Sequence, residues 1–71
     1  MINPKPGDLI EFIEARDQSY YTKTFIGKLG IVIENVHAKS SANIWKILVD
    51  DKFEIFHSLD FKLVQRSFRD D

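Results

Sequence analysis

The chain has 71 residues, no cysteine, two histidines and a formal net charge of −1, from 10 Lys/Arg and 11 Asp/Glu. This composition excludes disulfides and thiolate metal clusters, leaves too few ligands for a structural zinc site, and lacks the basic excess of dedicated nucleic-acid binders. We predict one domain over residues 1–71, with a thin core packed from six Phe, two Tyr, one Trp and many aliphatic side chains.

The chain also lacks long apolar segments. Its first residues show no apolar run of the kind found in signal peptides, and no stretch approaches the ~20 apolar residues of a membrane span. We therefore expect a cytoplasmic protein (in the host cytoplasm if the protein is viral) without a membrane partner.

The first predicted strand covers residues 8–14, where Ile10 and Phe12 share one face by alternation. Residues 15–26 are polar and show no sustained helical spacing, so we predict a long loop and no helix of useful length. Loops of this length are often functional.

The second predicted strand covers residues 29–36. Gly27 and Gly30 precede and open it, and glycine permits positive φ and close backbone approach there. The small polar residues 37–43 predict a loop. The third predicted strand, residues 44–50, places Trp45 and two aliphatic side chains, Ile47 and Val49, on one face.

Asp50-Asp51-Lys52 predicts a tight turn into a fourth strand, residues 53–56. Residues 57–60 are long enough for one 3₁₀ turn. A fifth strand follows at residues 61–65. The tail, residues 66–71, is expected to be flexible unless Phe68 docks on the domain.

Five short strands in so few residues predict an all-β fold. A closed or half-closed, strongly bent five-stranded barrel is favoured over a flat sheet, because closure removes exposed edges. The barrel is expected to cover about residues 6–65.

The segments Pro6-Gly7-Asp8-Leu-Ile-Glu-Phe and Gly27-Lys-Leu-Gly-Ile-Val-Ile-Glu34 resemble the opening of KOW and related Src-homology-3-like barrels. Residues 45–64 are similar to the distal hairpin, the 3₁₀ turn and the last strand of those barrels. The resemblance covers about residues 6–64, and short reading frames of this kind occur in tailed bacteriophages. It implies a Src-homology-3-like barrel with a 3₁₀ turn before its last strand, although the loop at 15–26 is longer than in KOW domains.

The residue types of a hydrolytic triad occur together at His57, Ser58 and Asp60. Neighbours in a 3₁₀ turn point in different directions, so we predict that Ser58 or Asp60 caps the turn instead. Asp50 and Asp51 are interpreted as turn residues, because a hairpin tip offers few convergent oxygens to a cation. We therefore expect no enzyme, no cofactor and no metal.

Aromatic residues in and near the long loop are candidates for partner binding, since Tyr and Trp are frequent at binding hot spots. The alternative is that they cover a small core. We predict that Trp45, Phe53 and Phe12 belong to the core. For Tyr20 and Tyr21 both readings stay open.

Lysines supply the second group of candidates. Lys23, Lys28, Lys39 and Lys46 are expected either to form the basic side of a nucleic-acid surface or to serve as ordinary solubilising charge.

These residues lead to two main hypotheses. The first is a non-catalytic protein-interaction module, such as a bacteriophage accessory protein that acts on a host or virion protein. The alternative is a KOW-like RNA- or DNA-binding barrel, and a small enzyme has the least support. A homodimer is also considered, through an exposed edge or an aromatic patch that includes Phe61 and Phe68. The candidate partner-binding residues are Tyr20, Tyr21, Lys23, Phe25, Lys28, Lys46 and Phe56.

Overall fold

The computed structural model describes residues 4–36 and 43–67. The elements in chain order are β1 (Leu9–Phe12), α1 (Tyr20–Lys23), β2 (Leu29–Asn35), β3 (Ile44–Val49), β4 (Lys52–His57), the 3₁₀ turn η1 (Ser58–Asp60) and β5 (Phe61–Gln65). The predicted all-β class is confirmed, and each predicted strand is present within two residues of its expected bounds. No described helix is long and apolar enough to cross a membrane.

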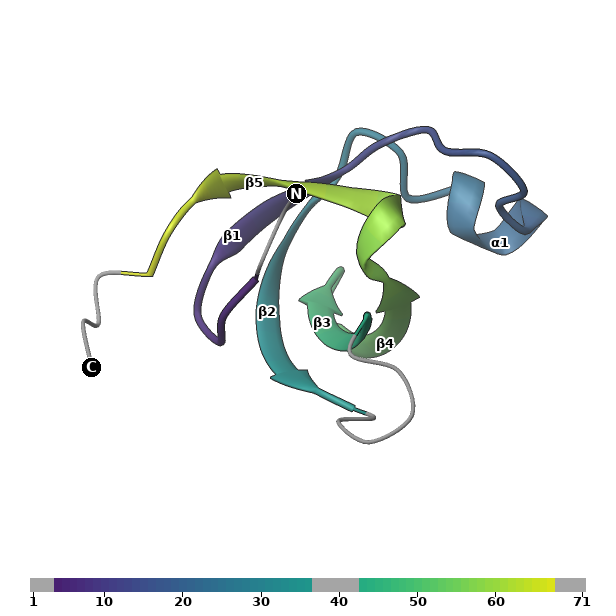
Figure 1. Ribbon diagram of the computed structural model, residues 1–71. Helices are drawn as coiled ribbons and strands as arrows, with labels where there is room; N and C mark the ends of the chain where they lie inside the picture. Colours follow the sequence, from purple (N-terminus) through teal and green to yellow (C-terminus); the bar gives the residue numbers. More distant parts are fainter. Residues whose placement is uncertain (1–3, 37–42, 68–71) are drawn as a thin grey trace.

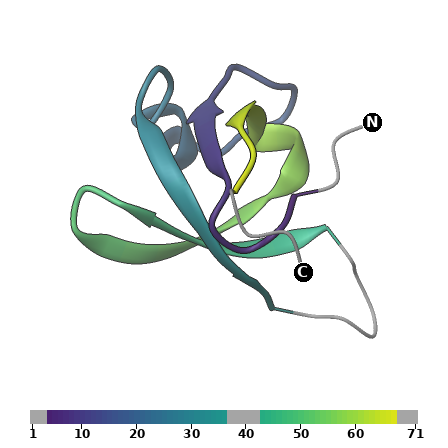
Figure 2. The same ribbon diagram turned by 90° about the vertical axis from the view of Figure 1, so that its left-hand side faces the viewer.

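The five strands form one antiparallel sheet in the order β4-β3-β2-β1-β5. The sheet curves strongly, with β2 long and bent and the β3–β4 hairpin projecting from it (Figures 1 and 2). It is not closed, because β4 and β5 lie at opposite edges and do not pair with each other. Of the predicted architecture, the single five-stranded sheet is therefore confirmed. Of the closed and half-closed alternatives, the fully closed barrel is wrong.

The predicted loop at 15–26 contains one helical turn, α1. Ser19 caps it: the hydroxyl oxygen accepts a hydrogen bond from the Thr22 backbone N–H at 3.1 Å. The expectation of an entirely irregular segment is thus wrong in its middle. A helix of four residues is too short to show a periodic spacing of apolar residues, so this spacing could not predict α1.

The turn between β3 and β4 decides which side chains face inward. Asp50 and Asp51 have φ values of 55° and 64°, and this pair of left-handed residues is typical of the type I′ turn of a two-residue hairpin. Val49 therefore pairs with Lys52, and Leu48 pairs with Phe53.

Phe53 is consequently not a core residue. Directly paired residues share a face of the sheet, and Leu48 lies on the opposite face from the buried Val49. The Phe53 side chain is 63% exposed, so the predicted burial is wrong. Phe56 points inward in its place, opposite Trp45.

The core occupies the concave side of the sheet, which we call the inner face. Phe12 lies at its centre, with its ring 4.5 Å from Phe56, 5.7 Å from Phe25 and 6.1 Å from Phe61 between centroids. The predictions for Phe12 and Trp45 are confirmed. The buried apolar set is Ile10, Phe12, Phe25, Val32, Trp45, Ile47, Val49, Phe56 and Phe61.

Two of the glycines act as predicted. Gly27 has a φ of 91°, which a side chain rarely adopts. Gly30 lies where β2 crosses the core closely: a Cβ there would stand 2.7 Å from Ile47 Cγ2 and 3.1 Å from the Leu48 carbonyl oxygen. The absence of side chains at these positions therefore allows the chain to turn and to bend over the core.

A buried carboxylate joins the two ends of the described chain. Asp8 is 1% exposed, and its two oxygens accept hydrogen bonds from the backbone N–H groups of Lys5 at 2.9 Å and Ser67 at 2.7 Å. These bonds satisfy the carboxylate away from water and fix the strand ends of β1 and β5 together.

Candidate functional site

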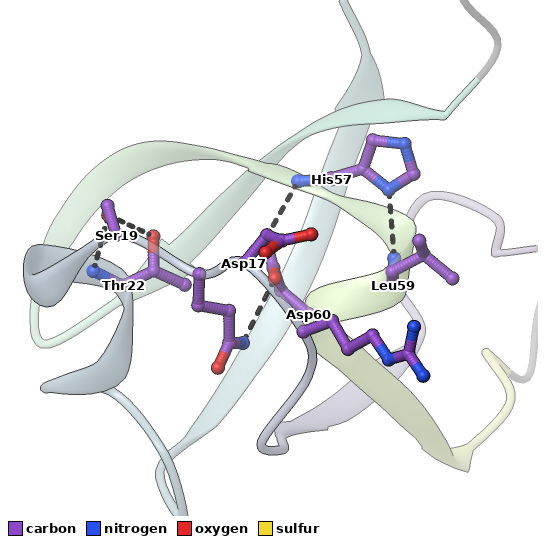
Figure 3. A pocket seen from close by; sticks show the side chains of 8 residues that line it. Asp17, Ser19, Thr22, His57, Leu59 and Asp60 are labelled. Carbon is purple, nitrogen blue, oxygen red and sulfur yellow. Dashed lines mark hydrogen bonds between the residues drawn. The ribbon is translucent and has the colours of Figure 1, made fainter.

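A pocket of about 410 Å³ lies between the loop that precedes α1 and the 3₁₀ turn η1 (Figure 3). The two segments are about forty residues apart in sequence, and the loop reaches over the end of the sheet to meet η1 (Figure 1). The residues that line the pocket are Arg16, Asp17, Gln18, Ser19, Thr22, His57, Leu59 and Asp60.

Gln18 ties the two walls of this pocket together. Its Nε2 donates to Asp60 Oδ1 at 3.0 Å and to the Ile13 carbonyl at 2.9 Å, and its Oε1 accepts from the Ala15 N–H at 3.0 Å. One side chain thus fixes the loop to itself and to η1. These bonds therefore hold the pocket in shape without a ligand, so less conformational entropy is lost when a partner binds.

The η1 wall is closed by a capping box. The His57 backbone N–H donates to Asp60 Oδ2 at 3.3 Å, and the His57 Nδ1 accepts from the Leu59 N–H at 3.1 Å. The predicted capping role of Asp60 is confirmed; the residue that caps with it is His57, and the capping alternative for Ser58 is wrong. Because Nδ1 accepts, the neutral ring carries its proton on Nε2, which is left as a donor.

These contacts also show how His57, Ser58 and Asp60, the residue types of a hydrolytic triad, are used in the structure. The imidazole of His57 and the carboxylate of Asp60 are both used in local capping within the turn. Ser58 is buried, and its N–H donates to the Asn43 carbonyl at 2.8 Å. The arrangement stabilises the turn, and within the described part of this segment it aligns no nucleophile with a base.

The two loop tyrosines lie differently. Tyr20 is 87% exposed on α1, next to the Ser19 wall of the pocket. Tyr21 packs edge-on against Phe25 at 5.2 Å and donates its hydroxyl to Glu54 Oε2 at 2.6 Å, which joins α1 to β4. The hydrogen bond to Glu54 raises the pKa of Tyr21, with smaller contributions in the same direction from desolvation and from the charges of Glu54 and Asp50.

The remaining predicted aromatics belong to the core. Phe25 and Phe56 are buried, with their rings 5.2 Å apart, so their assignment to a partner-binding surface is wrong. Phe25 lies two residues after the end of α1, where the chain returns to the sheet. Phe56 faces inward because its direct partner on β3 is the buried Trp45. Phe61 is buried as well, so it cannot contribute to an exposed aromatic patch, and Phe68 lies outside the described residues.

The predicted lysines do not form one surface. Lys28 is 3.0 Å from Asp50, whereas Lys46 is 3.2 Å from Glu34 and its ammonium lies 5.8 Å from the centre of the Phe53 ring. Lys23 is exposed on α1, and Lys39 lies outside the described residues. Of the seven predicted site residues, Tyr20, Tyr21 and Lys23 are the three that share an element.

Sequence reasoning missed the residues that build the pocket. Leu59 is 69% exposed in η1, and Arg16 and Gln18 come from the loop. A large apolar residue inside a polar 3₁₀ turn was a signal for Leu59. No local pattern indicates that Gln18 reaches Asp60, because that contact depends on the tertiary fold.

Among residues 4–36 and 43–67, no group of three or more His, Asp or Glu side chains is placed to hold a metal ion. In searches among known proteins, no family model, curated protein or solved structure matches the chain.

Proposed function

We propose that this chain is a non-catalytic protein-interaction module that binds its partner at the pocket between the 15–26 loop and η1. The observation that carries the proposal is the exposed Leu59 beside a pocket whose walls are already joined by Gln18 and Asp60. A rigid apolar contact surrounded by polar groups is the usual composition of a recognition site.

We also propose that the fold is of the Src-homology-3-like kind, with an open sheet. Support comes from the connectivity: a long loop after the first strand, a tight hairpin between the third and fourth, a 3₁₀ turn, and a last strand that returns to pair with the first. Fold likeness alone does not define a function, so the function rests on the pocket.

The chemistry of the pocket suggests the kind of partner. Leu59 in the pocket wall offers apolar contact area, and Tyr20, which follows Ser19 on α1 outside the lining, offers more. Arg16 and the Nε2 donor of His57 offer hydrogen bonds to carbonyl or carboxylate groups. A protein segment with an apolar side chain next to an acceptor group fits this combination. The resemblance to short bacteriophage reading frames makes a host or virion protein the natural source of that segment.

Affinity capture from host lysate, followed by mass spectrometry, tests the proposal. The wild type is compared with Leu59→Ser and with Tyr20→Ala, both of which change exposed side chains. Val64→Thr is the matched control, because Val64 is exposed on β5 and does not line the pocket. We expect the wild type and the control to recover the same protein. Leu59→Ser, in the pocket wall, should recover much less of it, and so should Tyr20→Ala, on the exposed surface of α1 that follows Ser19.

Recovery of no protein above background, or equal recovery by all four chains, would contradict the proposal. Binding of RNA or DNA that weakens steeply with added salt would support the KOW-like alternative instead. The ion pairs of Lys28 with Asp50 and of Lys46 with Glu34 argue against that alternative, because they neutralise two of the cations on which it depends.

A further inference from the structure

The convex side of the sheet, which we call the outer face, carries an apolar row across four strands. Leu9, Ile31, Leu48 and Phe53 are successive direct partners from β1 to β4, so their side chains lie on the same side. Leu9, Ile31 and Leu48 are half-buried, whereas Phe53 at the end of the row and Ile55 beside it are 63% and 53% exposed. An antiparallel sheet with one solvated face is normally polar there, so this row indicates an interaction surface.

The strand that ends the row is a free edge. β4 pairs with β3 over six consecutive residues and with no other described strand. It contains no proline, and its pairing with β3 is unbroken by a bulge. Natural edge strands usually carry proline, bulges or charged residues, because an unpaired row of N–H and C=O groups invites another strand. In β4 the charged residues are Lys52 and Glu54, and neither lies at the outward-pointing positions Phe53 and Ile55.

The turn identifies which backbone groups of β4 are unpaired. In a two-residue type I′ hairpin, the flanking pair Val49–Lys52 is hydrogen-bonded, and bonded and non-bonded pairs then alternate. The groups of Phe53, Ile55 and His57 therefore point away from β3. The bond from the His57 N–H to Asp60 Oδ2 agrees with this alternation, and it leaves Phe53 and Ile55 as the available N–H donors.

We propose that β4 pairs antiparallel with β4 of a second copy of this chain, about a twofold axis at Ile55. In this register Ile55 faces Ile55, and Phe53 faces His57, whose carbonyl accepts the Phe53 N–H. On the inner face Glu54 stands opposite Phe56. The outer apolar rows of the two copies then become continuous.

Side-chain pairing and the length of the backbone ladder together favour this register over its neighbours. A shift of the axis to Glu54 sets two Glu54 carboxylates directly opposite each other, which is unfavourable. A shift to Phe53 pairs Lys52 with Glu54, but it places the left-handed Asp51 of the turn against Ile55, so the backbone bonds on either side of the central pair are lost. The strand is thus complementary to itself when Ile55 is central, which is the argument for a second copy as the occupant.

The proposal is independent of the proposed function, since the pocket includes His57 but neither Phe53 nor Ile55. Because the chain has no cysteine, single introduced thiols report the register directly. In the Ile55→Cys variant the two thiols face each other across a bonded pair with Cα atoms ~5.5 Å apart, within disulfide reach. In Phe53→Cys they are offset by about 13 Å along the strand.

We expect Ile55→Cys to form a covalent dimer under mild oxidation and Phe53→Cys to lose that cross-link. Sedimentation of the cysteine-free wild type is expected to show a concentration-dependent dimer. Ile55→Lys, which places like charges at the axis, should raise its Kd about tenfold or more. Ile55→Thr, which keeps β-branching, should also raise the Kd, whereas Val64→Thr on β5 should leave it unchanged.

A wild type that sediments as a monomer at every concentration would overturn the proposal, and would leave the β4 edge to a strand of a different protein. Cross-linking of Phe53→Cys in preference to Ile55→Cys would overturn it as well. So would a dimer that Ile55→Lys and Ile55→Thr do not weaken while both keep a native far-ultraviolet dichroism spectrum.

Discussion

The inner and outer faces of the sheet are both lined with apolar side chains, but the inner face is buried whereas the outer face is half-buried along most of its row and exposed at β4. On the inner face Phe12 contacts three other aromatic rings that the loop, β4 and β5 bring over it. On the outer face Phe53 ends an apolar row and remains 63% exposed. Residue type alone therefore does not decide burial in this chain; the parity of each strand does.

The β3–β4 turn shows how that parity is set. Two left-handed aspartates fix a two-residue turn, and each residue of β4 then inherits the face of its partner on β3. One inserted residue would exchange Phe53 and Phe56 between the two faces. The difference between the faces can be tested by substitutions with effects of decreasing size.

The largest expected effect is a difference in the free energy of unfolding between a substitution on the inner face and one on the outer face. Phe12→Ala removes the ring at the centre of the core and should lower the free energy of unfolding by about 3–5 kcal/mol. Phe53→Ala removes an exposed ring of the same size and should change it by about 0.5 kcal/mol. Urea unfolding at low protein concentration measures both, and similar losses would contradict the distinction between the two faces.

A second substitution tests how closely β2 approaches the core. Gly30→Ala introduces a Cβ 2.7 Å from Ile47 Cγ2 and should cost up to about 3 kcal/mol of stability through overpacking. Gly27→Ala is the matched control, since no atom lies within 4 Å of its Cβ and the cost, about 1 kcal/mol, is backbone strain alone. Thermal unfolding should rank Gly30→Ala as the less stable protein, and the reverse order would contradict the close approach.

A third substitution concerns the seam between β1 and β5. Asp8→Ala leaves the N–H groups of Lys5 and Ser67 without the carboxylate and should cost about 2 kcal/mol. Asp8→Asn keeps one acceptor oxygen and should cost less. Hydrogen exchange of the Ser67 amide checks the cause: its protection should fall in Asp8→Ala, and unchanged protection in that variant would show that the bond does not stabilise the contact between β1 and β5.

The smallest expected effect concerns the hydrogen bond from Tyr21 to Glu54, which joins α1 to β4. The raised pKa of Tyr21 means that its protonated form is favoured in the folded state, so its bond to Glu54 contributes fully below the ordinary pKa near 10. The contribution is lost as the pH rises through the raised value. In a Tyr20→Phe background Tyr21 is the sole tyrosine, and its ultraviolet titration should shift to lower pH when Glu54→Ala is added. An unchanged titration would show that the bond is not formed in solution.

Much of the strand pattern was predictable, because alternation and turn residues act locally. The strand at 61–65, the 3₁₀ turn and the inward face of Trp45, Ile47 and Val49 were all identified from the sequence. Phe53 was misplaced even though the necessary information was present. Once Val49 faces inward and a two-residue turn follows, Phe53 must face outward.

The site was less predictable, because it depends on contacts between distant segments. Gln18 meets Asp60 across 42 positions of the chain, and no spacing rule links them. Tyr20 and Tyr21 were identified as candidates, but adjacent residues of one helical turn diverge, and only Tyr21 reaches Glu54. Phe25 was assigned to the surface because the return of the chain after α1 was not foreseen.

Nuclear Overhauser contacts of the two β4 phenylalanines test the division of the faces most directly. We expect the Phe53 ring to show contacts with Leu48, and the Phe56 ring to show contacts with Phe12 and Phe25. Contacts between the Phe53 ring and Phe12, together with a solvent-exposed Phe56 ring, would contradict the hairpin register and with it the outward position of Phe53.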